Sequence, residues 1–96
     1  MKEALKDFDK AFENRIRLGI MSALVVNDFI DFMALKELLG VTDGNLASHI
    51  KMLEKKQYIT FKKVFLDRKP NTVFSATAKG KNAFKRHIKA IELLLN

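Results

Sequence analysis

The order of helix breaks in the middle of this 96-residue chain restricts its fold more than any other feature. An apolar helical segment ends at Gly40, and a new helix begins just after Thr42. Glycine directly after a helix and threonine directly before one are residues that such boundaries favour. Two strand-like runs follow, over 58–66 and 72–76, with turn-forming residues between them. The pattern predicts two helices joined by a tight turn and followed by a β-hairpin.

Helical spacing is also present on the N-terminal side of this unit. Leu5, Phe8 and Phe12 recur at spacings of three and four residues, which predicts that they share one helical face. Asn14 is a favourable N-cap for a helix over 15–26. The two segments form either one kinked helix or two separate helices. The predicted inward residues of the second are Ile20, Met21 and Leu24.

The central pair of helices has its own caps and inward faces. Asp31 follows a short extended piece and can cap a helix over 32–39. Thr42 can cap the next helix, which runs to about residue 56, with Asp43 in the first turn, where the helix dipole favours an anion. The predicted inward residues are Leu35, Leu38 and Leu39 in the first helix and Leu46, Ile50 and Leu53 in the second.

The hairpin tip and a last helix complete the chain. Residues 67–71 form the predicted hairpin loop, which contains the only proline, Pro70. Thr77 can cap a final helix whose apolar residues follow a heptad spacing over two heptads. Those residues are Phe84, Ile88, Ile91 and Leu95. The sequence therefore predicts one domain over 1–96, mostly α with a small β-hairpin.

Charge is distributed unevenly along the chain, whose net charge is +7. Residues 1–50 contain 6 Lys/Arg and 8 Asp/Glu, a balance of −2, whereas residues 51–96 contain 12 and 3, a balance of +9. A basic half favours a surface that binds a polyanion. A lysine-rich solvated surface has the same composition, so the placement of the charges has to decide between them.

Several classes of function are disfavoured by composition. The absence of cysteine excludes disulfides and thiolate metal sites. No apolar run is long enough to span a bilayer and no signal-peptide pattern opens the sequence, so a cytoplasmic protein is expected. We find no nucleophile motif, phosphate-binding glycine loop or metal-ligand cluster, so neither an enzyme nor a cofactor is expected.

Two charged or polar surfaces are placed where DNA binding would need them. A rotation of about 100° per residue turns Gly44, Ser48 and the lysines 51 and 55 outward on the second helix of the pair. Small polar side chains can reach base edges in a major groove, and lysines can bind phosphates. An ordinary amphipathic surface helix has the same pattern. The hairpin adds Arg68 to the argument, because an arginine on a stiff tip suits a narrow minor groove, although a charged tip also prevents edge aggregation.

A family resemblance supports the DNA interpretation. The segment LKELLGVTDGNLASHIKMLEKKQYI, followed by FLDRKPNTVFSATAKG, resembles the compact winged-helix transcriptional regulators related to the MarR and ArsR groups. The resemblance implies a winged helix-turn-helix, a three-helical core plus wing, over 15–76. It also implies an N-terminal helical arm over 1–14 and a C-terminal dimerisation helix over 77–96. The implied partners are double-stranded DNA with a pseudo-palindromic operator and a second copy of the chain.

Specific residues follow from the pattern and the resemblance together. The chain is too short for the extra helices that hold an effector in larger MarR proteins, and the cysteines of ArsR metal sensors are missing, so the resemblance carries over no effector and the existence of one stays open. A winged helix used only for protein interaction is the alternative function. His49 lies at the edge of the core side, where packing competes with DNA contact. The predicted DNA-binding residues are Thr42, Gly44, Asn45, Ser48, His49, Lys51, Lys55, Lys62, Lys63, Arg68 and Lys69. The predicted dimer-interface residues are Leu5, Phe8, Phe12, Phe84, Ile88, Ile91 and Leu95.

Overall fold

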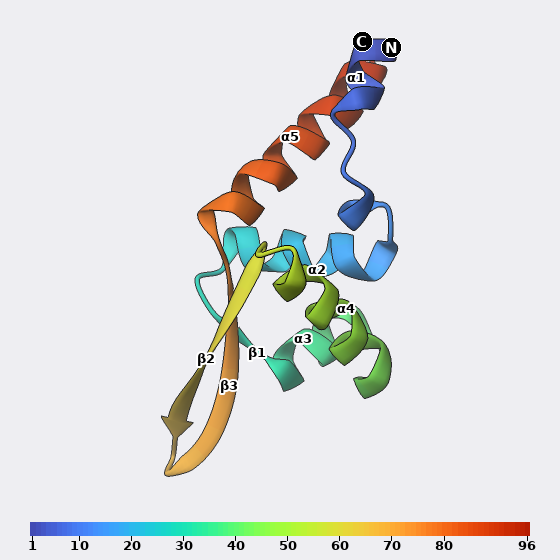
Figure 1. The fold of residues 1–96 in the computed structure, drawn as a ribbon. Coiled ribbons are helices and arrows are strands. Elements are labelled where there is room, and N and C mark those ends of the chain that lie inside the picture. Colours follow the sequence, from blue (N-terminus) through green and yellow to red (C-terminus); the bar gives the residue numbers. More distant parts are fainter.

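A computed structural model describes all 96 residues as helices packed on a three-stranded antiparallel sheet (Figure 1). None of its helices combines the length and the apolar content that crossing a membrane requires. The α-helices are α1 (Lys2–Lys6), α2 (Arg15–Val26), α3 (Phe32–Leu39), α4 (Asp43–Lys55) and α5 (Ala78–Leu94), and a short 3-10 helix, η1, spans Lys10–Phe12. The strands β1 (Ile30–Asp31), β2 (Ile59–Leu66) and β3 (Lys69–Ala76) lie in the order β1-β3-β2.

The predicted helix boundaries are confirmed, and each has a local cause. The side chains of Asn14, Asp31, Thr42 and Thr77 all accept hydrogen bonds from backbone N–H groups in the first turns of α2, α3, α4 and α5. Such bonds satisfy donors that the helix itself leaves unpaired. Gly40 ends α3 with a φ of +62°, a left-handed conformation that glycine adopts without steric cost.

The core lies between α2 and the helix-turn-helix pair, which consists of α3 and α4. All the inward residues predicted for α2 and α4 are buried, as is Leu35 of α3. Leu38 was predicted to be inward as well, and this is wrong, because its side chain is 64% exposed. Leu35 and Leu39 lie one turn apart and face the core together, whereas Leu38 is rotated onto the flank of α3, where no other element covers it.

The N-terminal arm does not present the single helical face that its spacing predicts. Helix α1 ends at Lys6, and η1 begins only at Lys10. Phe12 is 2% exposed inside the core, whereas Leu5 in α1 is 52% exposed. The break has a clear cause: the Asp9 side chain accepts a hydrogen bond from Ala11 N and so caps η1.

The hairpin turn is tighter than predicted. Five loop residues were expected, but β3 begins at Lys69, which pairs directly with Leu66. Only Asp67 and Arg68 remain in the turn, with φ values of +50° and +67°. Positive φ at both central residues is the mark of a type I′ turn, whose twist matches that of the strands. Pro70 is tolerated because β1 pairs only farther along β3, so this stretch has an open edge.

The start of α5 is pressed against the start of β2. Gly80 lies so close to Tyr58 that an added Cβ would be 2.1 Å from the Tyr58 carbonyl oxygen. The same oxygen accepts a hydrogen bond from Thr77 N at 3.0 Å. Only glycine fits at this position, so the contact fixes the direction in which α5 leaves the sheet.

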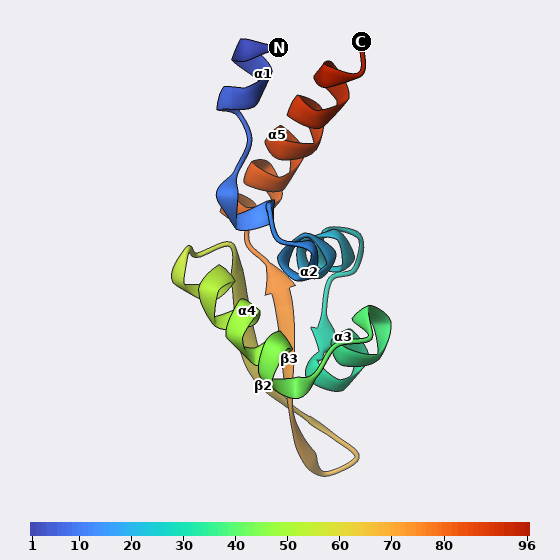
Figure 2. The ribbon, with the colours of Figure 1, turned by 90° about the vertical axis from the view of Figure 1, so that its right-hand side faces the viewer.

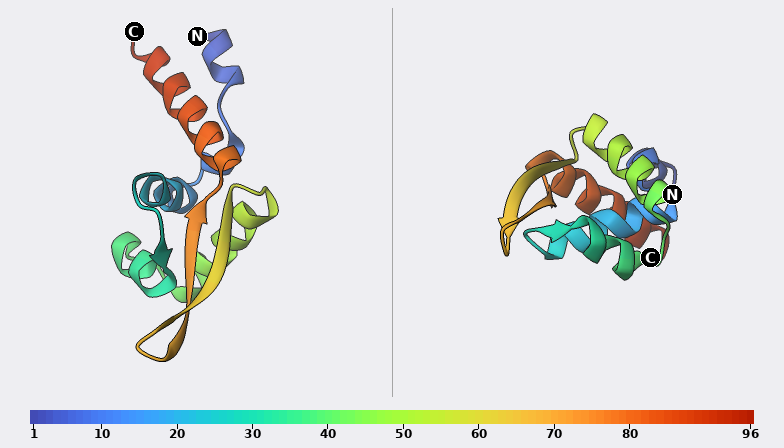
Figure 3. Two further views of the ribbon diagram at one scale, coloured as in Figure 1. Left: turned by 90° about the vertical axis from the view of Figure 1, so that its left-hand side faces the viewer. Right: turned by 90° about the horizontal axis from the view of Figure 1, so that it is seen from below.

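The molecule is elongated, with its two ends differently built (Figures 2 and 3). It measures 52 × 25 × 22 Å, and its radius of gyration is 14.3 Å, against about 12.5 Å for a compact domain of this length. The outer half of α5 and α1 extend side by side at one end, where both termini lie. The β2–β3 hairpin projects at the other end.

Candidate nucleic-acid interface

Helix α4 presents a polar outer surface. Buried Leu46, Ile50 and Leu53 hold its inner side against the domain. The four residues predicted to face outward are all exposed, namely Gly44, Ser48, Lys51 and Lys55, and so are Thr42 and Asn45. A Cβ added at Gly44 would meet no heavy atom within 4 Å. Packing within the chain therefore does not explain why a glycine stands in this helix.

A salt bridge links the two helices of the helix-turn-helix. Lys36 Nζ on α3 lies 2.8 Å from Asp43 Oδ1 in the first turn of α4. Asp43 places a negative charge near the positive end of the helix dipole, which is favourable. The pair is partly solvated, so its contribution to stability is small. Its consequence is positional, because it holds the start of α4 against α3.

His49 is turned toward the domain. Its Nδ1 lies 3.0 Å from Arg17 Nη1 and, since a guanidinium only donates, His49 accepts. Burial and the neighbouring Arg17 charge hold the pKa of His49 below its usual 6.5. Arg17 also donates from Nε to the Ala11 carbonyl at 2.7 Å. The histidine that was predicted as a DNA contact thus links α4 to α2 and η1.

The wing, which we define as residues 59–76, carries a strained and basic tip. Arg68 and Lys69 are exposed, and Arg68 has a φ of +67°. For a residue with a side chain, the left-handed conformation costs about 1–2 kcal/mol. Glycine or asparagine normally stands at such a position. An arginine here is an outlier of the kind found at functional sites.

The two lysines on β2 lie on opposite faces of the wing. Alternation along a strand separates Lys62 from Lys63. Lys62 Nζ lies 4.9 Å from the centre of the ring of Phe29, the residue directly before β1. Lys63 shares its face with Phe61, which lines a hollow together with Lys51 and Lys55 of α4. Only Lys63 therefore lies on the same side as the outer surface of α4.

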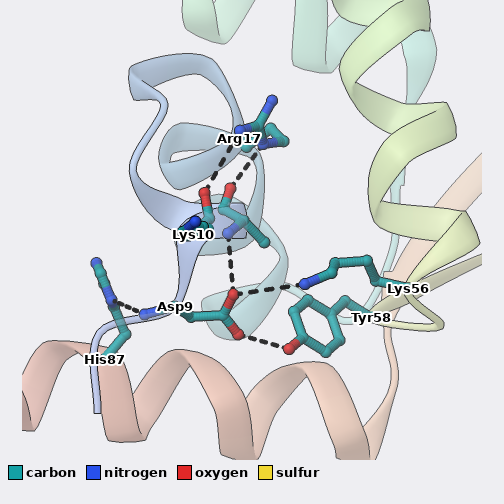
Figure 4. Close-up of polar contacts among 7 residues, drawn as sticks. Asp9, Lys10, Arg17, Lys56, Tyr58 and His87 are labelled. Carbon is teal, nitrogen blue, oxygen red and sulfur yellow. Dashed lines mark hydrogen bonds and ion pairs between the residues drawn. The ribbon is translucent and has the colours of Figure 1, made fainter. Parts of the chain in front are cut away.

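A polar network joins the arm, the end of α4 and α5 (Figure 4). Tyr58 donates its hydroxyl to Asp9 Oδ2, and Lys56 Nζ lies 3.8 Å from Asp9 Oδ1. The backbone N–H of Asp9 donates to His87 Nδ1 at 2.9 Å. His87 is 2% exposed, and its ring packs edge-on against Phe8 and Phe12.

The network shifts the pKa values of Asp9 and Tyr58 in opposite directions. Burial raises the pKa of Asp9, but the hydrogen bonds from Tyr58 and Ala11 N, with the charge of Lys56, outweigh it and place the pKa below 3.8. Burial, followed by the bond to Asp9, raises the pKa of Tyr58 from 10.0 to about 12. The proton therefore stays on the phenol and the charge on the carboxylate across the physiological range.

The predicted dimer-interface residues divide into three groups by burial. Phe12 belongs to the core, where it stacks on Tyr58 with ring centres 5.5 Å apart, so placing it at a surface was wrong. Leu5 and Leu95 are exposed, and the other four are half-buried: Phe8, Phe84, Ile88 and Ile91. The buried face of α5 consists instead of Gly80, Ala83, His87 and Ala90.

Comparison with known proteins decides the family. A family model described as a winged helix DNA-binding domain matches residues 16–95. The chain belongs to this family. An uncharacterized protein of Methanocaldococcus jannaschii is 37% identical to this winged-helix chain over 79 residues, which cover 82% of this chain and 86% of that protein.

Solved structures agree with the winged-helix family. A transcriptional regulator homologue from Pyrococcus horikoshii OT3 is 34% identical, with a TM-score of 0.85 over 98% of this chain and 91% of that one. A MarR-family transcriptional regulator from Silicibacter pomeroyi shares the fold at 12% identity, with a TM-score of 0.70 over 96% of this chain and 61% of that one. The protein is a winged-helix, helix-turn-helix regulator with a MarR-like fold.

The sequence alone does not predict the Asp9 network, because its residues lie far apart in the chain. Asp9 is 49 residues from Tyr58 and 78 residues from His87 in the chain. No periodicity connects such distant positions. The one local signal was Asp9 itself, two residues before Ala11, where an aspartate can cap a short helical turn.

Proposed function

We propose that the protein is a sequence-specific regulator that binds double-stranded DNA as a homodimer. Helix α4 enters the major groove, and the wing tip, residues 67–71, reaches the adjacent minor groove. Asn45 and Ser48 are the candidates for base contact, since amide and hydroxyl groups reach base edges. Arg68 and Lys69 occupy the minor groove, whose narrow segments attract cationic side chains.

Phosphate contacts follow from the same placement. Lys51 and Lys55 line the hollow between α4 and the wing, and Lys63 lies on the same face of β2 as Phe61, so the three lysines would neutralise phosphates of one strand. Lys62 lies on the other face of the wing, so we assign it to phosphates beyond the minor groove. The exposed start of α4, with Thr42 and Gly44, offers backbone N–H groups near the DNA backbone.

One observation carries the proposal. Arg68 keeps a left-handed backbone at the end of a projecting hairpin, although glycine would relieve the strain. Charge on a surface lysine can be incidental, whereas a strained arginine has a cost that folding alone does not explain. Because the chain belongs to a winged helix DNA-binding family, we assign DNA as the ligand of that arginine.

The dimer is supported by the apolar side of α5. Phe84, Ile88 and Ile91 form a half-buried stripe, and Leu95 continues it at 84% exposure. A helix that extends from the domain with an apolar side uncovered is stabilised by a second copy. Two copies related by a twofold axis would place their α4 helices about 34 Å apart, one turn of DNA.

Selection of bound sequences from a random duplex pool tests DNA binding, sequence specificity and half-site spacing together. On the selected duplex, Arg68→Ala is expected to weaken binding, while Lys55→Ala weakens binding to selected and random duplexes alike. Lys2→Ala, at the opposite end of the molecule, is the matched charge control and leaves both unchanged. If neither interface variant alters binding, the assignment is refuted.

Salt dependence separates this function from protein interaction alone. Binding through several lysines makes log K fall steeply with log salt. A wild-type protein that binds no duplex at low salt would instead be a winged helix that recognises a protein.

Sedimentation of the wild type tests the dimer independently. Ile88→Lys is expected to yield monomers because it places a charge in the apolar stripe.

A further inference from the structure

Two phenylalanines on the wing stay largely exposed although their strand is paired. Phe61 is 53% exposed and Phe65 is 75% exposed, both on β2. They are separated by Lys63, and alternation puts all three side chains on one face of the strand. This face, Phe61-Lys63-Phe65, is named here the aromatic strip. The strip is therefore an apolar, cation-centred surface rather than scattered exposed residues.

The Phe61 end of the aromatic strip faces α4 across a hollow. Phe61 lines this hollow together with Met52, Lys51 and Lys55 of α4. The hollow continues along Phe61 to an apolar floor that includes Ile50 and Phe74. One side of the cleft is thus cationic and the other aromatic, with apolar side chains beneath.

The pattern of charge indicates which partner fits. A second copy docked here through a twofold axis would bring like-charged lysines together, which is unfavourable. Glu54, half-buried between Lys51 and Lys55, is the single acidic residue of the lining and leaves the cleft positive. A strand of DNA backbone presents phosphates that alternate with apolar deoxyribose surfaces, which complements lysines that alternate with phenylalanines.

We propose that the cleft between α4 and the wing seats one sugar-phosphate strand of the duplex, and that Phe61 and Phe65 contact its deoxyribose units. This inference rests on the proposed DNA-binding function and adds a non-ionic component to it. Lys51, Lys55 and Lys63 hold the phosphates, and the two rings exclude water from the sugars between them. Phe65, close to the tip, lies where the strand enters the minor groove beside Arg68.

Non-ionic and ionic contacts respond differently to salt, and this difference is the test. Removing a phosphate contact reduces the slope of log K against log salt by about 0.9. Removing an apolar contact lowers K at every salt concentration and leaves the slope unchanged. We therefore expect Phe65→Thr and Phe61→Thr each to weaken binding about tenfold at constant slope. Lys63→Ala is expected to reduce the slope.

The variants are chosen to keep the fold intact. Threonine retains a high strand propensity, and both side chains are exposed, so thermal unfolding followed by circular dichroism should be unchanged. Phe29 provides the matched control: it is 54% exposed and lies on the opposite side of the wing, beneath Lys62. Phe29→Thr is expected to leave both affinity and slope as in the wild type.

The possible outcomes separate the two proposals. The experiment uses fluorescence anisotropy with the full chain and a labelled selected duplex over a salt series. A wild type with a steep slope whose phenylalanine variants bind equally well refutes this inference alone. Equal losses for Phe29→Thr and Phe65→Thr refute it too, as does a larger loss on single-stranded than on duplex DNA. A wild type that binds no duplex refutes the proposed function itself.

Discussion

Tyr58 allows the internal network to be tested without interference from other chromophores. It is the only tyrosine, and the chain has no tryptophan, so tyrosinate absorbance reports this residue alone. Its side chain is 8% exposed, stacks on Phe12 and donates to Asp9. Burial and that hydrogen bond raise the pKa of Tyr58 to about 12, whereas an unfolded chain titrates near 10.0. The folded state therefore holds the phenolic proton more tightly than the unfolded state.

The sign and size of the effect on stability follow from this difference. A group whose pKa is raised by folding stabilises the protein fully below its unfolded pKa, and the contribution is lost as pH rises through the folded pKa. Two pKa units correspond to about 2.7 kcal/mol, lost between pH 10 and pH 12. At pH 11 the loss amounts to about 1.4 kcal/mol.

Urea unfolding of the wild type and of Tyr58→Phe at pH 8 and pH 11 measures this loss. Effects of high pH that do not involve the phenol are common to both proteins, so the difference between them isolates the tyrosine. The wild type should lose about 1.4 kcal/mol more than the variant between the two pH values. At pH 8, Tyr58→Phe should already be less stable by about 1–3 kcal/mol, since it leaves the part-buried Asp9 carboxylate without its hydroxyl donor. Equal losses for both proteins, with tyrosinate forming near pH 10 in the folded state, would refute the reasoning.

Three substitutions that introduce or replace a glycine test the backbone geometry. Arg68→Gly relieves the positive φ and should stabilise the fold by about 1 kcal/mol while weakening DNA binding, so a variant that loses stability would contradict the strain argument. Gly44→Ala meets no neighbour and should stabilise α4 by about 0.5–1 kcal/mol, and weaker duplex binding in the same variant would identify close backbone approach to DNA. Gly80→Ala would drive a methyl group into the Tyr58 carbonyl, so chemical denaturation should reveal a loss of several kcal/mol, and a near-neutral result would show that α5 can shift.

Local chemistry explains why the order of elements could be predicted. A cap such as Thr42 acts on N–H groups within three residues, and Gly40 ends α3 through its own φ. The apolar spacing of α4 selects its buried side in the same way, because Leu46, Ile50 and Leu53 recur at helical intervals. Such effects are contained in the sequence itself.

Predictions that needed a partner from elsewhere in the chain were less successful. Phe12 has the spacing of a surface seam, but η1 turns it into the core beside Tyr58. The contact of Arg17 with the ring of His49 follows from no local pattern, and DNA contact by His49 stays a prediction. The hairpin loop contracted to two residues because strand pairing continued past Pro70, which no local rule required.

The sequence by itself determined that this chain is a helix-turn-helix followed by a basic hairpin, since caps, breakers and periodicity act over a few residues. Tertiary structure decided which charged residues share a surface. Lys63 lies on the same side of the wing as α4 and Lys62 on the other side. Strand alternation sends adjacent side chains to opposite faces, and only packing decides which face meets the helix. It also decided that Asp9, Tyr58 and His87 form one network, because only the folded chain brings such distant groups within hydrogen-bond distance.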